Sequence, residues 1–329
     1  MNTRAGIVEV AGLTVDFASP KGPIRAVGGV DLSLRPGETL ALLGESGSGK
    51  SVTLRALMRL HPSSARIGGD LRVDGRDVLA MSPRELSAYR GKTVSMIFQD
   101  PGLAFDPVYR IGDQIAEAVM RHERVSRAEA RRRALELFER VRIPSPDRRL
   151  DNYPHEMSGG MRQRAMIALA LACRPKVLLA DEPTTALDAT VQIQVLLLLR
   201  ELQREFGLAI VFVTHDIGVA VEIADRIAVM YAGRIVESGS CRDVIQAAAH
   251  PYTQGLLASR AHGTLAPDER LNAIPGAPPD LAAPPPGCAF GPRCGRFSED
   301  CARAVPGTVA ISAGHEARCL RLMPAGTAA

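Results

Sequence analysis

The sequence lacks tryptophan, and aromatic residues make up only 4% of its 329 positions. It has no run of 18 or more apolar residues, and its most apolar segments, near 167–172 and 195–199, are too short to span a bilayer. The first twelve residues mix charged and small side chains, without the apolar core of a signal peptide. These absences argue against a transmembrane helix. They predict a chain that is cytosolic or held at a membrane by a partner.

Charge of one sign is also scarce. The net charge of +4 does not by itself indicate a nucleic-acid partner. The basic run Arg131-Arg132-Arg133 falls in a predicted helix, where a solvated face is the favoured interpretation. A hydrophobic content of 46% permits a real core, and the length allows one large domain with a small one, or two medium domains.

Alternating strand and helix patterns fill residues 1 to about 260. Early strands are predicted at 7–17, 24–34 and 71–73, and a closing hairpin at 227–231 and 234–237. Ser126 and Glu129 have the spacing of a capping box, which predicts a helix that begins near Arg127. Ser158 is predicted to cap a second helix.

Residues 44–51 match the phosphate-loop pattern G-x-x-x-x-G-K-[ST] at every position. Glycines let such a loop wrap a polyphosphate, and the following helix adds the partial positive charge of its N-terminus. Lys50 is predicted to reach the β- and γ-phosphates, and Ser51 to ligate Mg²⁺. A chance Gly/Ser-rich turn is the alternative, but a buried strand at 39–43 and a helix at 52–60 flank the loop. The predicted nucleotide contacts are Gly44, Glu45, Ser46, Gly47, Ser48, Gly49, Lys50, Ser51 and Val52.

Two further apolar strands end in polar residues. Segment 177–180 is followed by Asp181 and Glu182, and segment 208–213 leads to His215. Ligands of doubly wound sheets lie at the carboxyl ends of strands. We therefore predict that Asp181 holds Mg²⁺, that Glu182 orients and deprotonates the attacking water, and that His215 contacts the γ-phosphate. A solvated acidic turn and a structural histidine are the alternatives.

A second anion site is predicted at Ser158-Gly159-Gly160, a turn that opens a helix. It lies more than 100 residues from the phosphate loop. Two such helix starts in one chain suggest half-sites that are completed across a dimer.

In their order and spacing, these motifs resemble the ATP-binding subunit of an ABC transporter over essentially the whole chain. The resemblance implies an α/β P-loop NTPase at 1–260, with an N-terminal antiparallel β subdomain and a helical subdomain at about 88–165. It assigns Gln99 to the Q-loop, beside Mg²⁺ and the catalytic group, and Ala186-Leu187-Asp188 to the D-loop. It makes His215 the switch histidine and Phe17 the adenine-stacking aromatic, although a strand aromatic of this kind is as often core. Met157 and Met161 depart from the family's usual Leu and Gln around Ser-Gly-Gly.

The C-terminal extension, residues 261–329, holds ten of the 23 prolines and four of the six cysteines. We expect an irregular appendage with a metal centre. The motif at 250–257 and the cysteine spacing resemble the oligopeptide/dipeptide importer ATPases, some of which hold a 4Fe–4S cluster. Four thiolates suit iron–sulfur or zinc, with His315 as a further zinc ligand, and free thiols remain the third alternative. The cysteines are Cys288, Cys294, Cys301 and Cys319.

The resemblance implies an ATPase, using ATP and Mg²⁺, that drives uptake of di- or oligopeptides. Its implied partners are a second ATPase subunit in a heterodimer, two permeases and an extracytoplasmic solute-binding protein, with this chain peripheral at the cytoplasmic face of the inner membrane. Nickel or glutathione import, export, and a soluble ABC ATPase acting on nucleic acid or ribosomes are the alternatives. Only 59 positions separate Gln99 from Ser158, which leaves no room for the coiled coil of repair ATPases.

Overall fold

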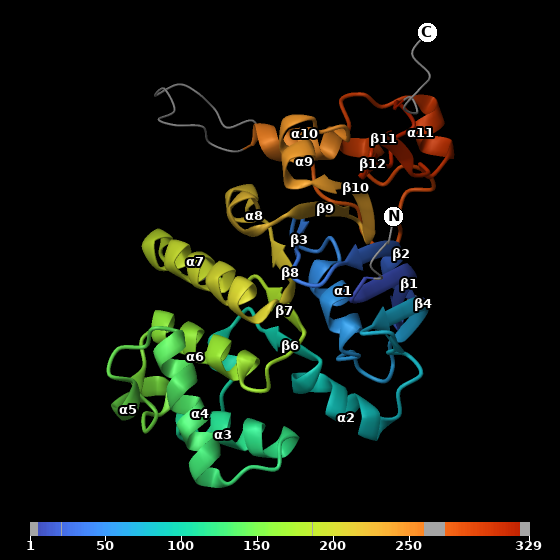
Figure 1. The fold of residues 1–329 in the computed structure, drawn as a ribbon. Helices are drawn as coiled ribbons and strands as arrows, with labels where there is room; N and C mark the ends of the chain where they lie inside the picture. Colours follow the sequence, from blue (N-terminus) through green and yellow to red (C-terminus); the bar gives the residue numbers. More distant parts are fainter. Residues whose placement is uncertain (1–5, 21, 186, 260–273, 323–329) are drawn as a thin grey trace. The chain divides into compact units, whose positions relative to one another are not determined.

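The computed structural model describes residues 6–20, 22–185, 187–259 and 274–322 (Figure 1). The chain forms two compact units, each assembled from segments distant in sequence. The first unit comprises residues 1–8, 33–39 and 72–213, and the second comprises 9–32, 40–71 and 214–329. The predicted domain boundary near residue 260 lies outside the described residues.

The first unit carries most of the helices and three parallel strands. Its elements are β5 (Arg76–Asp77), α2 (Pro83–Lys92), β6 (Val94–Ile97), η1 (Pro101–Leu103), α3 (Ile111–His122), α4 (Arg127–Arg140), α5 (Pro146–Arg149), η2 (Pro154–Glu156), α6 (Gly159–Leu171), β7 (Val177–Asp181), α7 (Ala189–Phe206) and β8 (Ala209–Thr214). Strand β7 pairs in parallel with β6 on one side and β8 on the other. Every residue of these three strands is buried, as expected for parallel strands covered on both faces. Their carboxyl ends therefore meet at one edge.

The second unit holds the remaining elements. These are β1 (Val8–Phe17), β2 (Ile24–Leu34), β3 (Thr39–Leu43), α1 (Lys50–Leu57), β4 (Arg66–Val73), α8 (Ile217–Ile223), β9 (Arg226–Tyr231), β10 (Arg234–Ser240), α9 (Cys241–Gln246), α10 (Pro251–Ala258), η3 (Gly291–Arg293), α11 (Glu299–Arg303), β11 (Val309–Ser312) and β12 (His315–Ala317). Strand β9 pairs in parallel with β3 and antiparallel with β10, which confirms the predicted hairpin. Strand β1 lies between β2 and β4.

The described part of the C-terminal extension, residues 274–322, is mostly loops and short 3₁₀ or α turns, but it also contains a small hairpin. Strand β12 pairs antiparallel with both β11 and β10, so the extension adds two strands to the sheet of the second unit. The expectation of a wholly irregular appendage was therefore incomplete. A three-residue strand such as β12 is too short to show a period of two in the sequence.

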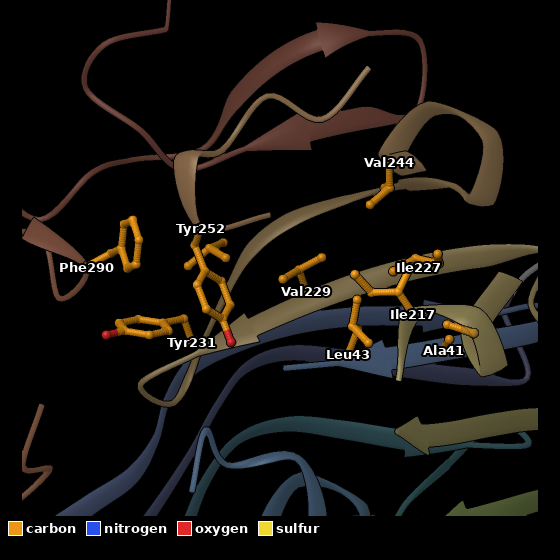
Figure 2. Packing of buried hydrophobic residues seen from close by; sticks show 11 residues of the cluster. Ala41, Leu43, Ile217, Ile227, Val229, Tyr231, Val244, Tyr252 and Phe290 are labelled. Carbon is orange, nitrogen blue, oxygen red and sulfur yellow. The ribbon is translucent and has the colours of Figure 1, made fainter. Parts of the chain in front are cut away.

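A core of aliphatic and aromatic side chains fills the second unit between β3, β9, α8 and α10 (Figure 2). Tyr231, Tyr252 and Phe290 close one end of it, and all three are nearly fully buried. Their ring centroids lie 4.6 to 5.4 Å apart, within the range of favourable aromatic pairs. Phe290 belongs to the C-terminal extension, so the extension supplies part of this core.

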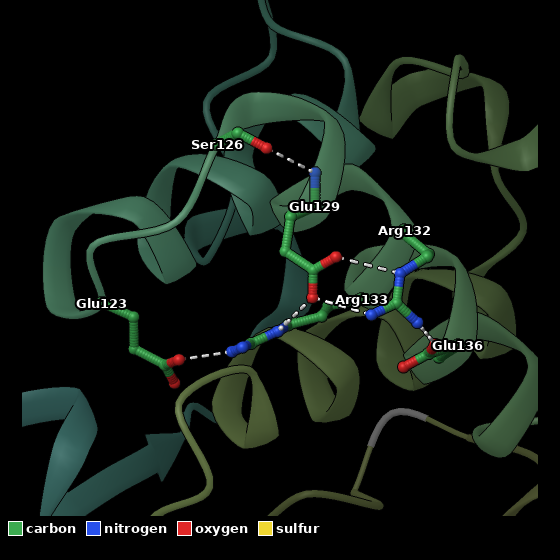
Figure 3. A network of polar contacts seen from close by, with 6 residues as sticks. All are labelled: Glu123, Ser126, Glu129, Arg132, Arg133 and Glu136. Carbon is green, nitrogen blue, oxygen red and sulfur yellow. Dashed lines mark hydrogen bonds and ion pairs between the residues drawn. The ribbon is translucent and has the colours of Figure 1, made fainter.

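Helix α4 begins where the sequence predicts it. Ser126 is the N-cap, and its hydroxyl accepts a hydrogen bond of 3.2 Å from the backbone N–H of Glu129 (Figure 3). The Glu129 carboxylate in turn accepts hydrogen bonds from Arg132 and Arg133. These hydrogen bonds lower the pKa of Glu129, with Arg132 as the largest contributor.

The basic run on α4 is compensated within the first unit. Arg131 pairs with Asp151, Arg132 with Glu129 and Glu136, and Arg133 with Glu123 and Glu129. Cations that already pair with carboxylates make a weak attractor for phosphate backbones. The basic run therefore lies on a partly exposed helix face, as predicted, where neighbouring carboxylates as well as water solvate its charges.

Within the described ranges, no helix combines the length and the apolar character that a bilayer crossing requires.

Replacing Ser126 by Ala removes the side-chain acceptor at the start of α4. The free energy of unfolding is expected to fall by about 1 kcal/mol, the usual cost of losing an N-cap. Urea unfolding followed by circular dichroism measures this change. Ser126→Asp keeps an acceptor at the cap and should stay close to wild type. Equal losses in the two variants would contradict the capping role.

Candidate nucleotide-binding site

The phosphate loop lies in the second unit, between the fully buried strand β3 and helix α1. Gly49 is the N-cap of α1 with φ of 103°, so Lys50 and Ser51 belong to the first helical turn. The helix was predicted to begin at Val52. It begins two residues earlier because Gly49 makes the reversal that would otherwise interrupt it.

Lys50 folds back over its own loop. Its ammonium Nζ donates to the carbonyl oxygens of Gly44 at 2.7 Å and of Glu45 at 2.8 Å, and only 5% of the residue is exposed. The turn between β9 and β10 also holds the loop backbone, because the Ser48 carbonyl accepts a 2.9 Å hydrogen bond from the N–H of Gly233. The ammonium also lies 3.5 Å from the Ser48 hydroxyl, so the loop's own main chain and one of its side chains position it.

Close packing explains the second glycine of the motif. A Cβ on Gly49 would lie 2.7 Å from the carbonyl oxygen of Ala26 and 2.7 Å from the methyl carbon of Met230. A Cβ on Gly47, by contrast, would meet no atom within 4 Å. Ser46 and Gly47 are exposed, which leaves that side of the loop open to a ligand.

Two residues outside the loop contact Glu45. Its N–H donates to the hydroxyl of Tyr252 at 2.9 Å, and its carboxylate pairs with Arg293. Reasoning from the sequence missed both partners. They are 207 and 248 positions away, and no local pattern indicates such a contact.

Asp181 and Glu182 lie in the first unit, at the carboxyl end of β7. Asp181 is 2% exposed, and Glu182 follows it with φ of 46°, a left-handed conformation that is uncommon for a residue with a side chain. The Glu182 N–H donates to the Val213 carbonyl on β8 at 3.1 Å. Backbone strain held by such contacts is a frequent feature of functional sites.

The carboxylate of Glu182 meets the predicted Q-loop residue. Its Oε2 accepts hydrogen bonds from Thr185 Oγ1 at 3.0 Å and from Gln99 Nε2 at 3.5 Å. Gln99 is exposed just after β6, and Glu182 is half-buried. The structure thus brings together two residues, 83 positions apart, that were predicted to serve one reaction.

The Ser158-Gly159-Gly160 turn opens α6, as predicted. The Ser158 hydroxyl accepts a 3.3 Å hydrogen bond from the N–H of Met161, and Ser158 and Gly159 are exposed. A Cβ on Gly159 would meet nothing within 4 Å, whereas one on Gly160 would lie 3.1 Å from Val191. Met157 is buried, consistent with a packing role for this departure from the family's usual Leu.

Three other predicted residues have identifiable surroundings. Phe17, at the end of β1, is half-exposed and meets the ring of His61 edge-to-face at 5.5 Å, so it is not a core residue. Asp188 is exposed and caps α7 through the N–H of Val191. His215 is exposed after β8, directly before the Asp216 N-cap of α8. Ala186 of the predicted D-loop lies outside the described residues.

The four C-terminal cysteines are free thiols. Backbone N–H groups donate to two sulfurs, from Arg296 to Cys294 at 3.3 Å and from Arg321 to Cys319 at 3.4 Å. Burial raises the pKa of the Cys288 and Cys294 thiols. Among the described residues, no group of three or more His, Cys, Asp or Glu side chains is arranged to hold a metal ion.

His315 does not serve as a zinc ligand in this structure, contrary to the possibility raised from the sequence. Its Nε2 lies 2.8 Å from the Glu237 carboxylate, and both side chains are almost completely buried. The pair joins β12 to β10. The position of His315 near the cysteines suggested a metal ligand, and nothing in the sequence indicated Glu237 as its buried partner.

Comparison with known proteins identifies the family of this chain. Residues 27–185 match the family model for ABC transporters, and residues 236–301 match the model for the C-terminal region of oligopeptide/dipeptide transporters.

The relatives include the oligopeptide transport ATP-binding protein OppD of Salmonella typhimurium, 48% identical over 96% of this chain and 93% of that protein. The OppD protein of Bacillus subtilis is 49% identical over 86% of this chain and 80% of that protein. A solved dimeric ATP-binding cassette, bound to ADP and Pi, aligns with a TM-score of 0.65 and 30% identity over 71% of this chain and 99% of its own length. This chain therefore belongs to the ATP-binding proteins of ABC transporters, in the group that carries the oligopeptide/dipeptide C-terminal region.

Proposed function

We propose that this chain is the ATP-hydrolysing subunit of a peptide importer. The observation that carries the proposal is the pairing of Glu182 with Gln99 at the carboxyl edge of a parallel sheet, in a chain that also holds Lys50 inside a complete phosphate loop. A loop of this kind binds a nucleotide, whereas the carboxylate and amide handle the water that attacks it. Relatives of similar length are named as peptide transport ATP-binding proteins.

In this proposal Lys50 and the N–H groups at 46–52 bind the phosphates of ATP. Ser51, Asp181 and Gln99 would hold Mg²⁺, which would offset the negative charge of the phosphates. The oxygen donors of Ser51 and Asp181 suit Mg²⁺, which prefers hard oxygen ligands. Phe17 stacks on the adenine. Its half-exposed ring at a strand end supports that assignment.

Hydrolysis needs a group that orients water and accepts its proton. Glu182 suits this role because Thr185 and Gln99 hold its carboxylate and the backbone at Glu182 is locked by its bond to Val213. His215 is proposed to contact the γ-phosphate.

We further propose that two such chains, or this chain and a similar partner, complete each other's sites. Ser158, Gly159 and Gly160 would bind the nucleotide of the opposite subunit, and Asp188 would lie near the same interface. The exposed start of α6 supports this role, and the solved cassette that aligns with this chain is dimeric. A heterodimer is the arrangement that we favour.

An exposed apolar surface follows the Q-loop. Leu103, Val108 and Tyr109 are 85%, 69% and 60% exposed, and Phe98 is 39% exposed. Exposed large apolar side chains that follow one another in the sequence are a feature of interaction surfaces, and we propose that a permease subunit docks on this segment. With two permeases and an extracytoplasmic binding protein, the chain would work at the cytoplasmic face of the inner membrane.

We also propose a division into domains and an occupant for the cysteine site. We divide the chain into a nucleotide-binding domain at 1–260, with its helical subdomain at about 88–165, and the C-terminal extension at 261–329. A 4Fe–4S cluster on Cys288, Cys294, Cys301 and Cys319, with Zn²⁺ as the alternative, rests on the resemblance and on cysteine spacing. Iron, sulfide and zinc analysis of anaerobically purified protein distinguishes these occupants from free thiols.

Replacing Lys50 by Ala removes the ammonium that the phosphates would meet. The Kd for ATP is expected to rise about 10- to 100-fold, since hydrogen bonds to charged groups contribute about 1.5–3 kcal/mol. Titration of the purified chain with a fluorescent ATP analogue measures this Kd. Lys92→Ala, which removes an exposed lysine at the end of α2, should bind as wild type does.

The same variant tests the cargo. Cells that carry Lys50→Ala should lose uptake of labelled di-, tri- or longer peptides relative to wild type. Selective loss of Ni²⁺ or glutathione uptake would replace the peptide assignment. Unchanged uptake of every cargo, in a strain without a redundant system, would favour an exporter or a soluble ATPase.

Glu182→Gln keeps the shape of the side chain and removes its basicity. ATP turnover by the assembled complex is expected to fall at least about 100-fold, the usual contribution of a general base, while ATP stays bound. Phosphate release and retained radiolabelled ATP measure the two effects. Glu139→Gln, at an exposed position of α4, is the matched control. Normal turnover in Glu182→Gln would remove this residue from the mechanism.

A further inference from the structure

Glu45 presents a conflict inside the phosphate loop. It places a carboxylate in a loop that is built to bind anions, and an unpaired negative charge there would repel a triphosphate. In the structure, a residue outside the loop neutralises this charge. Arg293, in the C-terminal extension, donates from Nη1 to Oε2 at 2.6 Å and from Nη2 to Oε1 at 3.0 Å. Such bidentate pairs are the strongest and most directional contacts between arginine and carboxylate.

Arg293 occupies a built site. Its side chain is 4% exposed, and its remaining donors reach the carbonyl oxygens of Pro275 at 2.9 Å and Ile274 at 3.3 Å. Nη1 also donates to the hydroxyl of Tyr231 at 3.3 Å. The guanidinium is therefore held in one orientation before it meets Glu45. The hydrogen bond to Glu45 is the main cause of the raised pKa of Arg293.

The aromatic cluster forms the wall of this site. The guanidinium carbon of Arg293 lies 5.8 Å from the centroid of the Tyr231 ring, within cation–π range. Phe290, three positions before Arg293, packs on Tyr231 and Tyr252 (Figure 2). The packing of Phe290 therefore fixes the extension next to Arg293.

Tyr252 adds a second tie. Its hydroxyl accepts the backbone N–H of Glu45 at 2.9 Å, and burial raises the pKa of this hydroxyl, so it stays neutral. Side chain and main chain of Glu45 are therefore fixed separately. The carbonyl of the same residue accepts the Lys50 ammonium at 2.8 Å. A displacement of Glu45 would consequently displace an acceptor that positions Lys50.

We propose that Arg293 and Tyr252 are positioning residues for the phosphate loop, through which α10 and the C-terminal extension set the affinity of the loop for the phosphates of ATP. Arg293 neutralises Glu45, and both residues fix the main chain that orients Lys50. This inference rests on the proposed binding of ATP by the loop. Neither residue touches the nucleotide in this proposal.

Arg293→Gln leaves the Glu45 carboxylate unpaired beside the phosphates. The Kd for ATP of the full-length chain is expected to rise about tenfold, the effect of one lost charge-assisted contact. Adding Glu45→Gln removes the repulsive charge and should return the Kd to within about threefold of wild type. In the assembled complex, KM should rise with little change in kcat, because Glu182 is untouched. Arg296→Gln, an exposed neighbour in the extension, is the matched control.

Tyr252→Phe keeps the ring in the aromatic cluster and removes only the hydroxyl. It serves if Arg293→Gln fails to fold, and it should raise the Kd several-fold while nucleotide-free thermal unfolding shows an intact fold. Hydrogen exchange of residues 44–49 should be faster in both variants than in the control.

Three outcomes would overturn the inference, and they differ in what they imply for the proposed function. Wild-type affinity in Arg293→Gln and Tyr252→Phe, with binding lost in Lys50→Ala, would overturn the inference and leave the proposed function intact. A weakened affinity that Glu45→Gln does not relieve would also overturn it, because the effect would then be general destabilisation. Absence of ATP binding by the wild-type chain would overturn both proposals.

Discussion

The hydrogen bonds from Lys50 to the carbonyls of its own loop are the interaction on which the proposed phosphate site depends. They require the chain to leave the buried strand β3 and, before α1 begins at Lys50, to present two carbonyl oxygens at 2.7 and 2.8 Å from one ammonium. Only a residue without Cβ fits at Gly49, against Ala26 and Met230. The hairpin after β9 supports the loop from below through Gly233. The geometry of the loop is thus determined by neighbours on several elements.

In the first unit, a backbone conformation held by hydrogen bonds positions one side chain, the Glu182 carboxylate. Glu182 takes a left-handed backbone conformation because its N–H is bound to β8 directly after β7 ends. That conformation turns the carboxylate toward Gln99 and Thr185, which hold it by hydrogen bonds. A carboxylate fixed in this way loses little entropy when it orients a water molecule. The strain is local, and the fully buried strands beneath it supply the rigidity.

Sequence patterns predicted what local chemistry determines. Strands β2 and β3, the start of α4 after Ser126 and the hairpin of β9 and β10 follow from apolar runs, a capping residue and a turn. The place of Glu182 at a strand end also followed from the pattern of the parallel sheet, whereas its grouping with Gln99 was implied by the resemblance to ABC transporter ATPases. The contact between Arg293 and Glu45 did not follow, since 248 positions separate the two residues and the phosphate-loop motif leaves the position of Glu45 unspecified. The partner of His315, which was raised from the sequence as a possible further zinc ligand, was missed for the same reason, because Glu237 lies 78 positions away.

The C-terminal extension is better regarded as part of the nucleotide site than as an appendage. One buried carboxylate, Glu237, pairs with His315 of β12 and accepts the N–H groups at 249 and 250, where α10 begins. That helix carries Tyr252 to the outer side of the loop, and η3 carries Arg293 there. Glu45 lies within the match to the ABC transporter model and Arg293 within the match to the C-terminal model. The solved cassette bound to ADP and Pi aligns with only 71% of this chain, so a cassette need not contain everything found here. In this chain the need arises from Glu45, whose negative charge makes the loop dependent on the arginine that pairs with it.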